Sequence, residues 1–468
     1  MTDTATGDDD GSNDQAWRAR AGRRWFELSL GVVAFVAFAI PAYYTASVRA
    51  HQTFWGDPRF FYYWPATQVA QGRGFLDVLT MQFGQPVPSA SHPPGFITLL
   101  AGFYKLGFQS PQAMRYLLCI MSAATVVVVG LLVARVIGRR AGLIAAGIAA
   151  IYPNIWISST LVMSETLFLF GLSLGLLGFY AFFERPRSRS VAVASIGLTL
   201  AASARPEILV LFAVMIVPVI FSRRRSLATP QQFRLVVLAA VFPLLVFAPW
   251  FVYNLNRFER PVLVSTGFGQ TMLTGACDSV FYGERIGYWS VNCTANSHPP
   301  EPAEGDVPDQ SVLDAYYRKR AIRYYSYHKS QVPLVVAARI GRMFGVYQPK
   351  QQNFADRYVD KRGSYDLVRA SQFSFWVLGL LSIPGLILWR RRKIAIYPLV
   401  GIFAIAVVVE ALTFGNTRYR VGVDLCAVLL AATAIDWAIG RFTRRHRASP
   451  AEDEPVDTIS DDVVATSS

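Results

Sequence analysis

Long apolar stretches alternate with short polar segments along most of the 468-residue chain. A helix of about 20 mainly apolar residues crosses a hydrocarbon core of ~30 Å, so each such stretch predicts a membrane-spanning helix. The pattern predicts an all-α polytopic membrane protein with ten spans. They are expected at residues 26–48, 113–133, from 141 to a turn between 153 and 165, 166–183, 191–204, 208–221, 233–253, 373–389, 394–414 and 421–439.

Charge sets the orientation of these spans. Short runs of Lys and Arg between the spans supply 22 basic residues on one side of the membrane, whereas the short turns on the other side hold only Arg205, Arg418 and Arg420. Because short basic loops stay in the cytoplasm, this bias places both termini inside. The net charge of +14 therefore indicates cytoplasmic loops and not a nucleic-acid-binding surface. The first span is too long for a signal peptide, and many spans follow it.

The polar segments divide the chain into five parts. The tails are low in apolar residues and are expected to be disordered. The expected parts are a cytoplasmic tail at 1–24, a membrane module at 25–253 with a first outer loop at 49–112, an extracytoplasmic region at 254–366, a second set of spans at 367–440 and a cytoplasmic tail at 441–468.

Asp57 is the leading candidate for catalysis. It follows the first span and precedes five consecutive aromatic residues, at 60–64, a composition that favours the membrane–water boundary. A carboxylate at headgroup depth can take the proton of an attacking hydroxyl as a general base. The alternative is a helix N-cap, which Asp often provides, with Pro58 at the first helical position.

Other candidate residues lie on the same outer side. His92, in the sequence HPPG, either donates a hydrogen bond to a phosphate or merely precedes two prolines that set an extended entry into a helix. Arg205 lies between two short apolar stretches, so the turn is expected below the outer surface. A recessed arginine suits a phosphate, and an ion pair with Glu207 is the alternative.

Further charged residues, Glu207 among them, are expected to contribute to substrate binding. Glu165 is either a pocket residue or an acid at a helix start, where the macrodipole stabilises it. Arg418 and Arg420, in GNTRYR, run against the charge bias and indicate an anionic partner. Arg339 and Arg342 are also candidates for binding an anionic partner, and they lie in an apolar segment that is expected along the membrane interface.

The four cysteines are too few for a disulfide scaffold, and no Cys/His cluster has zinc-site spacing. Cys277 and Cys293 both lie in the outer region, where a bridge would persist, and they are predicted to pair. Cys119 and Cys426 fall within spans and are expected to be inert core thiols. Neither a metal site nor a cofactor is expected.

The order of several short motifs resembles the GT-C superfamily of membrane glycosyltransferases. They are GDPRFFYYWPATQVAQGRGF, HPPGF, SETLF, ARPE, APWFVYNLNRFERPV and GNTRYR. The branch that the chain is most similar to contains protein mannosyltransferases, aminoarabinose transferases and RgtA/B/C/D-like proteins (family 39). The resemblance covers nearly the whole chain and is strongest in the first seven spans.

The resemblance implies a function on the outer face of the cytoplasmic membrane. It implies a polyprenyl-phosphate sugar donor, inversion at the anomeric carbon and an acceptor hydroxyl on a lipid, glycan or protein. The family's first-loop acid maps onto Asp57, but the second acid of many members is replaced here by Pro58. A lysine of the aminoarabinose branch is replaced by His92. A transporter or lipid flippase is the alternative class and predicts internal repeats, which the sequence does not show; a non-catalytic envelope-assembly partner is the third.

Overall fold

The computed structural model describes residues 9–81, 86–212, 215, 228–297 and 308–447. Parts of both expected tails lie outside these residues. So does most of the expected sixth span at 208–221, together with the basic run at 223–225.

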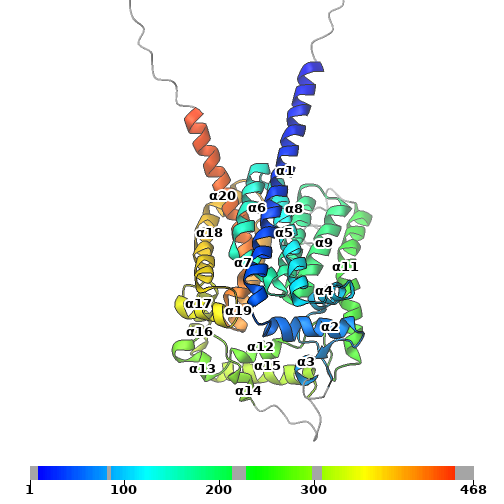
Figure 1. The fold of residues 1–468 in the computed structure, drawn as a ribbon, viewed down its shortest axis with the longest axis vertical. Coiled ribbons are helices and arrows are strands. Elements are labelled where there is room, and N and C mark those ends of the chain that lie inside the picture. Colours follow the sequence, from blue (N-terminus) through cyan, green and yellow to red (C-terminus); the bar gives the residue numbers. More distant parts are fainter. Residues whose placement is uncertain (1–8, 82–85, 213–214, 216–227, 298–307, 448–468) are drawn as a thin grey trace, which may run out of the picture.

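A bundle of long helices forms the body of the molecule (Figure 1). Its helices are α1 (Asp9–Ser47), α5 (Pro111–Val136), α6 (Arg139–Ile151), α8 (Glu165–Glu184), α9 (Ser188–Ala204), α11 (Thr229–Leu255), α18 (Tyr365–Arg391), α19 (Tyr397–Leu412) and α20 (Val421–Arg447). Short helical turns connect several of them, namely α7 (Pro153–Trp156), η3 (Ile157–Thr160), η4 (Pro206–Ile208) and η6 (Thr417–Arg420).

The described helices make the chain a multi-pass membrane protein. Six of them, α1, α5, α8, α11, α18 and α20, are long and apolar enough to cross a membrane. A seventh span results if α6 is counted together with the helical segment 153–160, which is bent from it by 65°. Helices α9 and α19 are apolar but shorter. The predicted total of ten spans stays a prediction, because the sixth lies largely outside the described residues.

The first outer loop folds into short elements packed under the bundle. They are η1 (Arg49–His51), the π-helix η2 (Pro58–Tyr63), α2 (Trp64–Ala70), β1 (Leu76–Asp77), α3 (Val78–Met81), β2 (Val87–Pro88) and α4 (Pro94–Lys105). Strands β1 and β2 pair antiparallel, with Leu76 opposite Pro88 and Asp77 opposite Val87. This two-residue ladder is the only sheet within the described part of the chain.

The expected extracytoplasmic region at 254–366 folds into short helices at the same end. They are α12 (Phe268–Thr274), α13 (Asp278–Phe281), η5 (Gly283–Arg285), α14 (Asn292–Ala295), α15 (Gln310–Tyr327), α16 (Val332–Met343) and α17 (Pro349–Tyr358). They surround a small core of their own that includes Leu273, Phe281 and Val335. The disulfide between Cys277 and Cys293 joins α13 to α14. Cys119 and Cys426 are free and buried.

Polar side chains fix where helices of the outer end begin. The Asp309 carboxylate accepts hydrogen bonds from the backbone N–H groups of Ser311 and Val312, at the start of α15. The Ser364 hydroxyl accepts one from Leu367 N at 3.2 Å and caps α18. Each cap satisfies a backbone donor that the first helical turn leaves without a partner.

Close packing of α8 against α9 sets the position of two site residues. An added Cβ at Gly197 would lie 2.2 Å from the backbone nitrogen of Gly175, so only glycine allows the two backbones to approach this closely. Glu165 opens α8 and Arg205 follows the last residue of α9. The contact therefore brings these two side chains together at one end of the helix pair.

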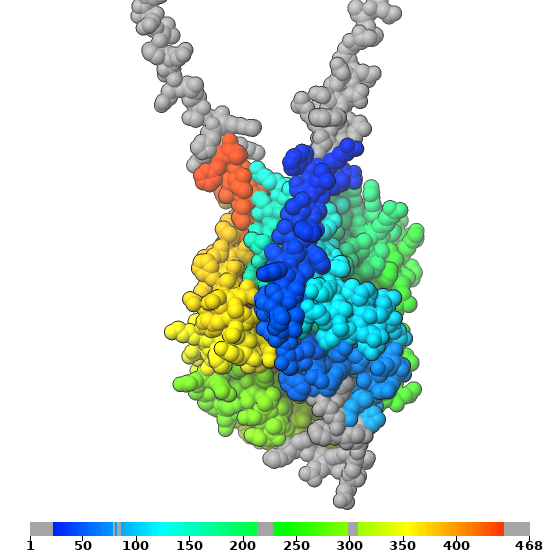
Figure 2. All heavy atoms as spheres, viewed as in Figure 1, coloured from blue at the N-terminus to red at the C-terminus, as the bar shows by residue number. Residues whose placement is uncertain are grey.

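The described ends of α1 and α20 project from one end of the bundle, opposite to α12, α14 and α15 (Figure 1). In the space-filling view α1 forms a ridge across the surface (Figure 2), and its Leu28, Val32 and Phe35 side chains are exposed. Exposed apolar side chains on spanning helices are expected to face lipid. The sides of the membrane on which these two ends lie stay a prediction from the charge bias.

Single cysteines at Ser330 and Ser188 test the orientation. Ser330 lies between α15 and α16, Ser188 begins α9, and both are exposed. A membrane-impermeant maleimide added to intact cells should label Ser330→Cys and should leave Ser188→Cys unlabelled until the cells are opened. The native background is low because two cysteines are bridged and two are buried. The reverse labelling would place the outer region in the cytoplasm.

Candidate functional site

Four connections at one end of the bundle bring charged side chains together. Asp57 directly precedes η2, Glu165 begins α8, Arg205 lies between α9 and η4, and Arg418 belongs to η6. The sequence predicts all four on the outer side, and the structure makes them neighbours. Their ion pairs join parts of the chain that are up to 361 residues apart.

Arg418 is the centre of this cluster. Its Nη1 donates to Asp57 Oδ2 at 3.3 Å, and its Nε donates to Glu165 Oε1. Glu165 Oε1 also accepts from Arg205 Nη2 at 3.3 Å. The result is an alternating chain of charges, Asp57–Arg418–Glu165–Arg205, in which Glu165 is 1% exposed whereas the Asp57 side chain is 54% exposed. The buried end holds the arginines, and the exposed end presents a carboxylate.

Asp57 occupies the N-cap position of η2 with Pro58 next to it, but its side chain makes no capping hydrogen bond. Gly56 precedes it with φ of +85°, in the left-handed region that favours glycine. This turn brings the Asp57 carboxylate to Arg418. The N-cap alternative therefore describes the backbone of Asp57 and leaves its side chain available for chemistry.

Arg205 is recessed, being 8% exposed. Its partner is Glu165, and the ion pair with Glu207 considered from the sequence does not form. Its guanidinium also donates to the Tyr419 carbonyl at 3.3 Å and lies 5.2 Å from the centroid of the Phe168 ring. Through these contacts Arg205 holds Glu165 and η6 in place. Glu207 has no ion-pair partner among the described residues.

A cavity of about 220 Å³ opens beside Asp57. Four of its described lining side chains are basic and two are acidic, so it favours an anion. The lining residues are Arg49, Gln52, Thr53, Phe54, Trp55, Gly56, Asp57, Pro58, Arg115, Leu161, Met163, Trp289, Val359, Asp360, Lys361 and Arg418. Arg205 does not line it. We call this space the charged cavity.

Two arginines of the charged cavity are buried without an acidic partner. Arg49 is 3% exposed and Arg115 is 6% exposed, and neither forms an ion pair with a described residue. Arg49 Nη2 and Arg115 Nε also lack a hydrogen-bond partner within the described part of the chain. A buried cation without a counter-ion is costly. Because both arginines line the charged cavity, an anion there would lie near both guanidinium groups and offset their charge.

His92 lies next to the cluster and is neutral. Its ring centroid is 4.9 Å from that of Tyr62 and 5.3 Å from that of Phe61. Burial lowers the pKa of His92 to about 4, although the nearby Asp57 charge opposes the shift. Its Nδ1 lies 3.2 Å from Ser91 Oγ. A neutral imidazole can donate one hydrogen bond to a phosphate but adds no positive charge there.

Arg339 and Arg342 are fully buried in α16 and do not line the charged cavity. Arg339 Nη1 donates to the Ala411 carbonyl at 2.7 Å, and Arg342 Nε donates to the Ile286 carbonyl at 2.8 Å. These bonds connect α16 to α19 and to the segment after η5. Both arginines hold the outer region together, so we do not propose them as substrate ligands.

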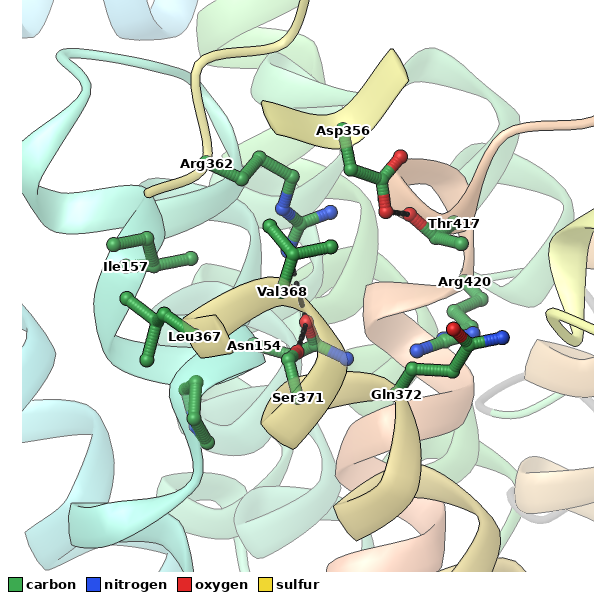
Figure 3. Close-up of a pocket in the computed structure, with 11 residues that line it drawn as sticks. Asn154, Ile157, Asp356, Arg362, Leu367, Val368, Ser371, Gln372, Thr417 and Arg420 are labelled. Carbon is green, nitrogen blue, oxygen red and sulfur yellow. Dashed lines mark hydrogen bonds between the residues drawn. The ribbon is translucent and has the colours of Figure 1, made fainter. Parts of the chain in front are cut away.

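Arg420 also has a structural position. Its Nε lies 3.3 Å from Asp424 Oδ1, and its guanidinium lies 3.8 Å from the Phe375 ring centroid. Figure 3 shows it beside a polar network in which Thr417 donates to Asp356 at 2.6 Å and Arg362 donates to Asn154. The space among these residues is about 10 Å³, roughly the volume of one water-sized probe. The network packs against η6, and the space within it is too small to bind a sugar.

Asp360 is the second carboxylate of the charged cavity and comes from the segment between α17 and α18. Its Oδ2 accepts a hydrogen bond from Asn416 Nδ2 at 3.0 Å. Burial, and then the charge of Asp356, raise the pKa of Asp360 to about 6. This residue therefore changes its charge in the range between pH 5 and 7.

The raised pKa predicts a pH-dependent effect of Asp360→Asn on stability. The folded state binds the proton more tightly than the unfolded state, so the stability contributed by protonated Asp360 is present below about pH 4 and is lost as the pH rises through 6. The asparagine variant should therefore gain stability over the wild type as the pH rises from 4 to 7, by on the order of 1–2 kcal/mol after screening. Thermal unfolding in detergent at several pH values measures this difference. A pH-independent difference would contradict the shift.

The sequence interpretation missed four charged residues that line the charged cavity, namely Arg49, Arg115, Asp360 and Lys361. Arg49 follows the first span and Arg115 lies near the outer end of α5, so the available signal was an arginine within or beside an apolar span. Asp360 has no comparable signal, because its position depends on how the outer helices fold. No group of three or more His, Cys, Asp or Glu side chains suited to a metal ion occurs within the described ranges.

Comparisons with known proteins agree with this architecture. Residues 91–253, roughly a third of the chain, match the model of the dolichyl-phosphate-mannose-protein mannosyltransferase family. No curated protein matches the chain. Among solved structures, the apo oligosaccharyltransferase of Archaeoglobus fulgidus aligns with a TM-score of 0.51 at 12% identity, over 90% of this chain and 51% of that one.

A second structure from that organism gives the same result. The archaeal oligosaccharyltransferase AglB, in complex with an inhibitory peptide and a dolichol-phosphate, aligns with a TM-score of 0.50 at 14% identity, over 92% of this chain and 53% of that one. The chain thus spans about half the length of the solved structures that it matches. At these identities the likeness establishes the fold.

Proposed function

Because the chain has the fold of the GT-C superfamily of membrane glycosyltransferases, we propose that it transfers a sugar from a polyprenyl-phosphate donor to an acceptor hydroxyl. The reaction takes place on the outer face of the cytoplasmic membrane. The configuration of the anomeric carbon, which forms the new glycosidic bond, is inverted. The acceptor hydroxyl belongs to a lipid, a glycan or a protein.

The observation that carries this proposal is the charged cavity. Arg49 and Arg115 are buried in it without a counter-ion, Arg418 reaches it from η6, and Asp57 lies at its edge. Arginine suits phosphate because its planar guanidinium offers paired N–H donors. A donor phosphate at the arginines would leave its sugar next to the Asp57 carboxylate. The AglB structure was solved with a dolichol-phosphate, which is the same chemical class of lipid.

In the proposed reaction Asp57 takes the proton of the acceptor hydroxyl. The hydroxyl oxygen forms a bond to the anomeric carbon as the bond from that carbon to the phosphate oxygen breaks. The electron pair of the broken bond remains on polyprenyl phosphate, and the arginines stabilise its charge. A single displacement of this kind inverts the anomeric carbon. Asp57 then releases the proton to solvent through its exposed side.

In this proposal the donor is not a nucleotide sugar, and the arginines take the place of a metal ion in stabilising the leaving group. The leaving group of a lipid donor is a single phosphate, and fixed guanidinium groups in a cavity with partly apolar walls can stabilise it without a divalent cation. Phe54 and Trp55 line the same cavity. Such aromatic side chains are typical of the membrane interface, from which a lipid donor would enter.

The release of polyprenyl phosphate by the purified protein tests the role of the arginines. Arg49→Gln and Arg115→Gln should each raise the KM for a polyprenyl-phosphate sugar about 10-fold or more, because each variant removes a charged hydrogen-bond donor. Arg260→Gln is the matched control, since Arg260 is exposed in the outer region and lies outside the cavity. An unchanged KM in both cavity variants, with normal amounts of folded protein, would contradict the proposed phosphate position.

A further inference from the structure

A second cavity, of about 210 Å³, lies on the other side of η2 from Asp57. It is enclosed by the first outer loop on one side and by α12 and α15 on the other. Its lining residues are Phe60, Phe61, Pro65, Leu76, Asp77, Ser89, Ser91, Thr266, Gln270, Gln310, Leu313, Asp314 and Tyr317. We call this space the neutral-donor cavity, because its hydrogen-bond donors are hydroxyl and amide groups.

The chemistry of the two cavities is opposite. The described lining of the neutral-donor cavity contains no Lys or Arg. It contains two carboxylates, several hydroxyl and amide groups, and the aromatic rings of Phe60, Phe61 and Tyr317. Asp314 pairs with Arg318, 3.9 Å away and outside the lining, so the described lining itself offers a phosphate two carboxylates and no cation, which disfavours it. Carboxylates and amides instead accept hydrogen bonds from sugar hydroxyls, and aromatic rings pack against the apolar faces of sugar rings.

The wall of this cavity is fixed before any ligand binds. Gln310 Nε2 donates to Asp77 Oδ2 at 2.8 Å. Gln310 Oε1 accepts from Ala90 N at 3.1 Å and from Thr266 Oγ1 at 3.2 Å. One side chain of α15 therefore ties together the first outer loop and the segment before α12. Such preorganisation lowers the entropy cost of binding a polar ligand.

One short helix connects the two cavities. Asp57 and Pro58 line the charged cavity, and Phe60 and Phe61 of the same helix line the neutral-donor cavity. Three to four residues of helix cover only about 5 Å at ~1.5 Å per residue. The rings of Trp55 and Phe60, one in each lining, are in edge contact with centroids 4.6 Å apart. The two cavities are therefore neighbours on either side of this ring contact, and an acceptor bound in one would reach Asp57 by extending past the rings.

We propose that the neutral-donor cavity binds the acceptor and that the acceptor is a carbohydrate. This inference rests on the proposed function and names its acceptor class. A sugar unit of the acceptor binds between Phe60, Phe61 and Tyr317, and the hydroxyl that is to be glycosylated points past η2 toward Asp57. The donor's own sugar stays with its phosphate in the charged cavity, so the two substrates approach Asp57 from opposite sides.

Gln270 is the best residue for a test. It lies in α12, is exposed, and its amide has no hydrogen-bond partner among the described residues. Gln270→Ala should therefore leave the fold intact and remove one ligand contact. Tyr317→Phe is the second variant and removes only a hydroxyl. Gln71→Ala is the control, because Gln71 is exposed in the first outer loop and lines neither cavity.

The experiment has a binding arm and a kinetic arm, both with the full-length protein in nanodiscs. Saturation-transfer NMR without donor uses glucose, galactose, mannose, arabinose, rhamnose and short oligomers of each as probes. At least one should bind, and Gln270→Ala should weaken its binding about 10-fold while Gln71→Ala should not. With a polyprenyl-phosphate sugar as donor, Gln270→Ala should raise the KM for the saccharide acceptor by a similar factor and leave the KM for the donor within twofold.

The other outcomes separate this inference from the proposed function. If no saccharide binds while the wild type still transfers sugar to a Ser/Thr-containing peptide, the acceptor is a protein and the inference is wrong. If Gln270→Ala raises the KM for the donor and not that for the acceptor, the cavity holds the donor's sugar and the inference is again wrong. If saccharides bind as expected but the wild type never consumes a polyprenyl-phosphate sugar, the proposed function fails.

Discussion

Replacing Asp57 by asparagine is expected to lower sugar transfer by about 100-fold or more, the typical contribution of a positioned general base. Asparagine keeps the shape of the side chain and can still accept a hydrogen bond from Arg418 Nη1, which lies 3.3 Å from the carboxylate. It cannot take a proton from the acceptor hydroxyl. The loss should therefore appear in kcat, and the KM for the donor should change little.

Asp366→Asn is the matched control for this variant. Asp366 is also an exposed aspartate in the first turn of a helix at the outer end, but it does not line the charged cavity. Its replacement should leave transfer within twofold of the wild type. Near-normal transfer by Asp57→Asn at normal membrane levels would remove Asp57 as the base, and Asp360 would then be the remaining acidic side chain of the cavity.

Arg418→Ala is expected to have the second large effect, a loss of about 100- to 1,000-fold in kcat/KM, as observed when one donor to a developing charge is removed. Arg418 orients Asp57, pairs with the buried Glu165 and lines the charged cavity. The alanine variant removes all three contacts. Glu165 keeps Arg205 as a partner, so the fold should survive the change.

Arg418→Lys separates charge from geometry. Lysine restores a positive charge but cannot reach Asp57 and Glu165 at once with a planar fork, so it should recover only part of the activity. Arg205→Ala should also lower activity, but by displacing Glu165 and η6, because Arg205 does not line the charged cavity. Full recovery by Arg418→Lys would show that only the charge matters.

The sequence predicts several membrane helices, and the described helices confirm them, because apolar length reflects the cost of placing polar groups in lipid. The side of the membrane on which the site lies stays a prediction from the basic bias. The motifs around Asp57, Glu165, Arg205 and Arg418 lie on four separate turns, and the fold brings all four side chains together. The topology therefore made their meeting predictable.

The choice of partners among these residues was not predictable. Glu207 is two residues from Arg205 and was the natural partner in the sequence, yet Arg205 pairs with Glu165, 40 residues away. The reason is the close packing of α8 on α9, which depends on contacts such as Gly175 with Gly197. Local spacing gives no information on such a contact.

The fold determines which of the remaining arginines line the charged cavity. Arg339 and Arg342 looked like anion-binding residues, but their guanidinium groups donate to backbone carbonyls inside the outer region. Arg49 and Arg115 looked unremarkable, yet these two buried arginines line the charged cavity, which Arg339 and Arg342 do not. A sequence shows that a span contains an arginine, but only the fold shows whether the guanidinium already has partners.

The donor assay tests the central claim most directly. The purified protein is offered either a radiolabelled polyprenyl-phosphate sugar or the matching nucleotide sugar, each with and without EDTA, together with a saccharide acceptor. The account predicts transfer from the lipid donor alone, unaffected by EDTA. Transfer from the nucleotide sugar alone would contradict the proposed donor, and complete loss of transfer with EDTA would contradict stabilisation of the leaving phosphate by arginines without a metal.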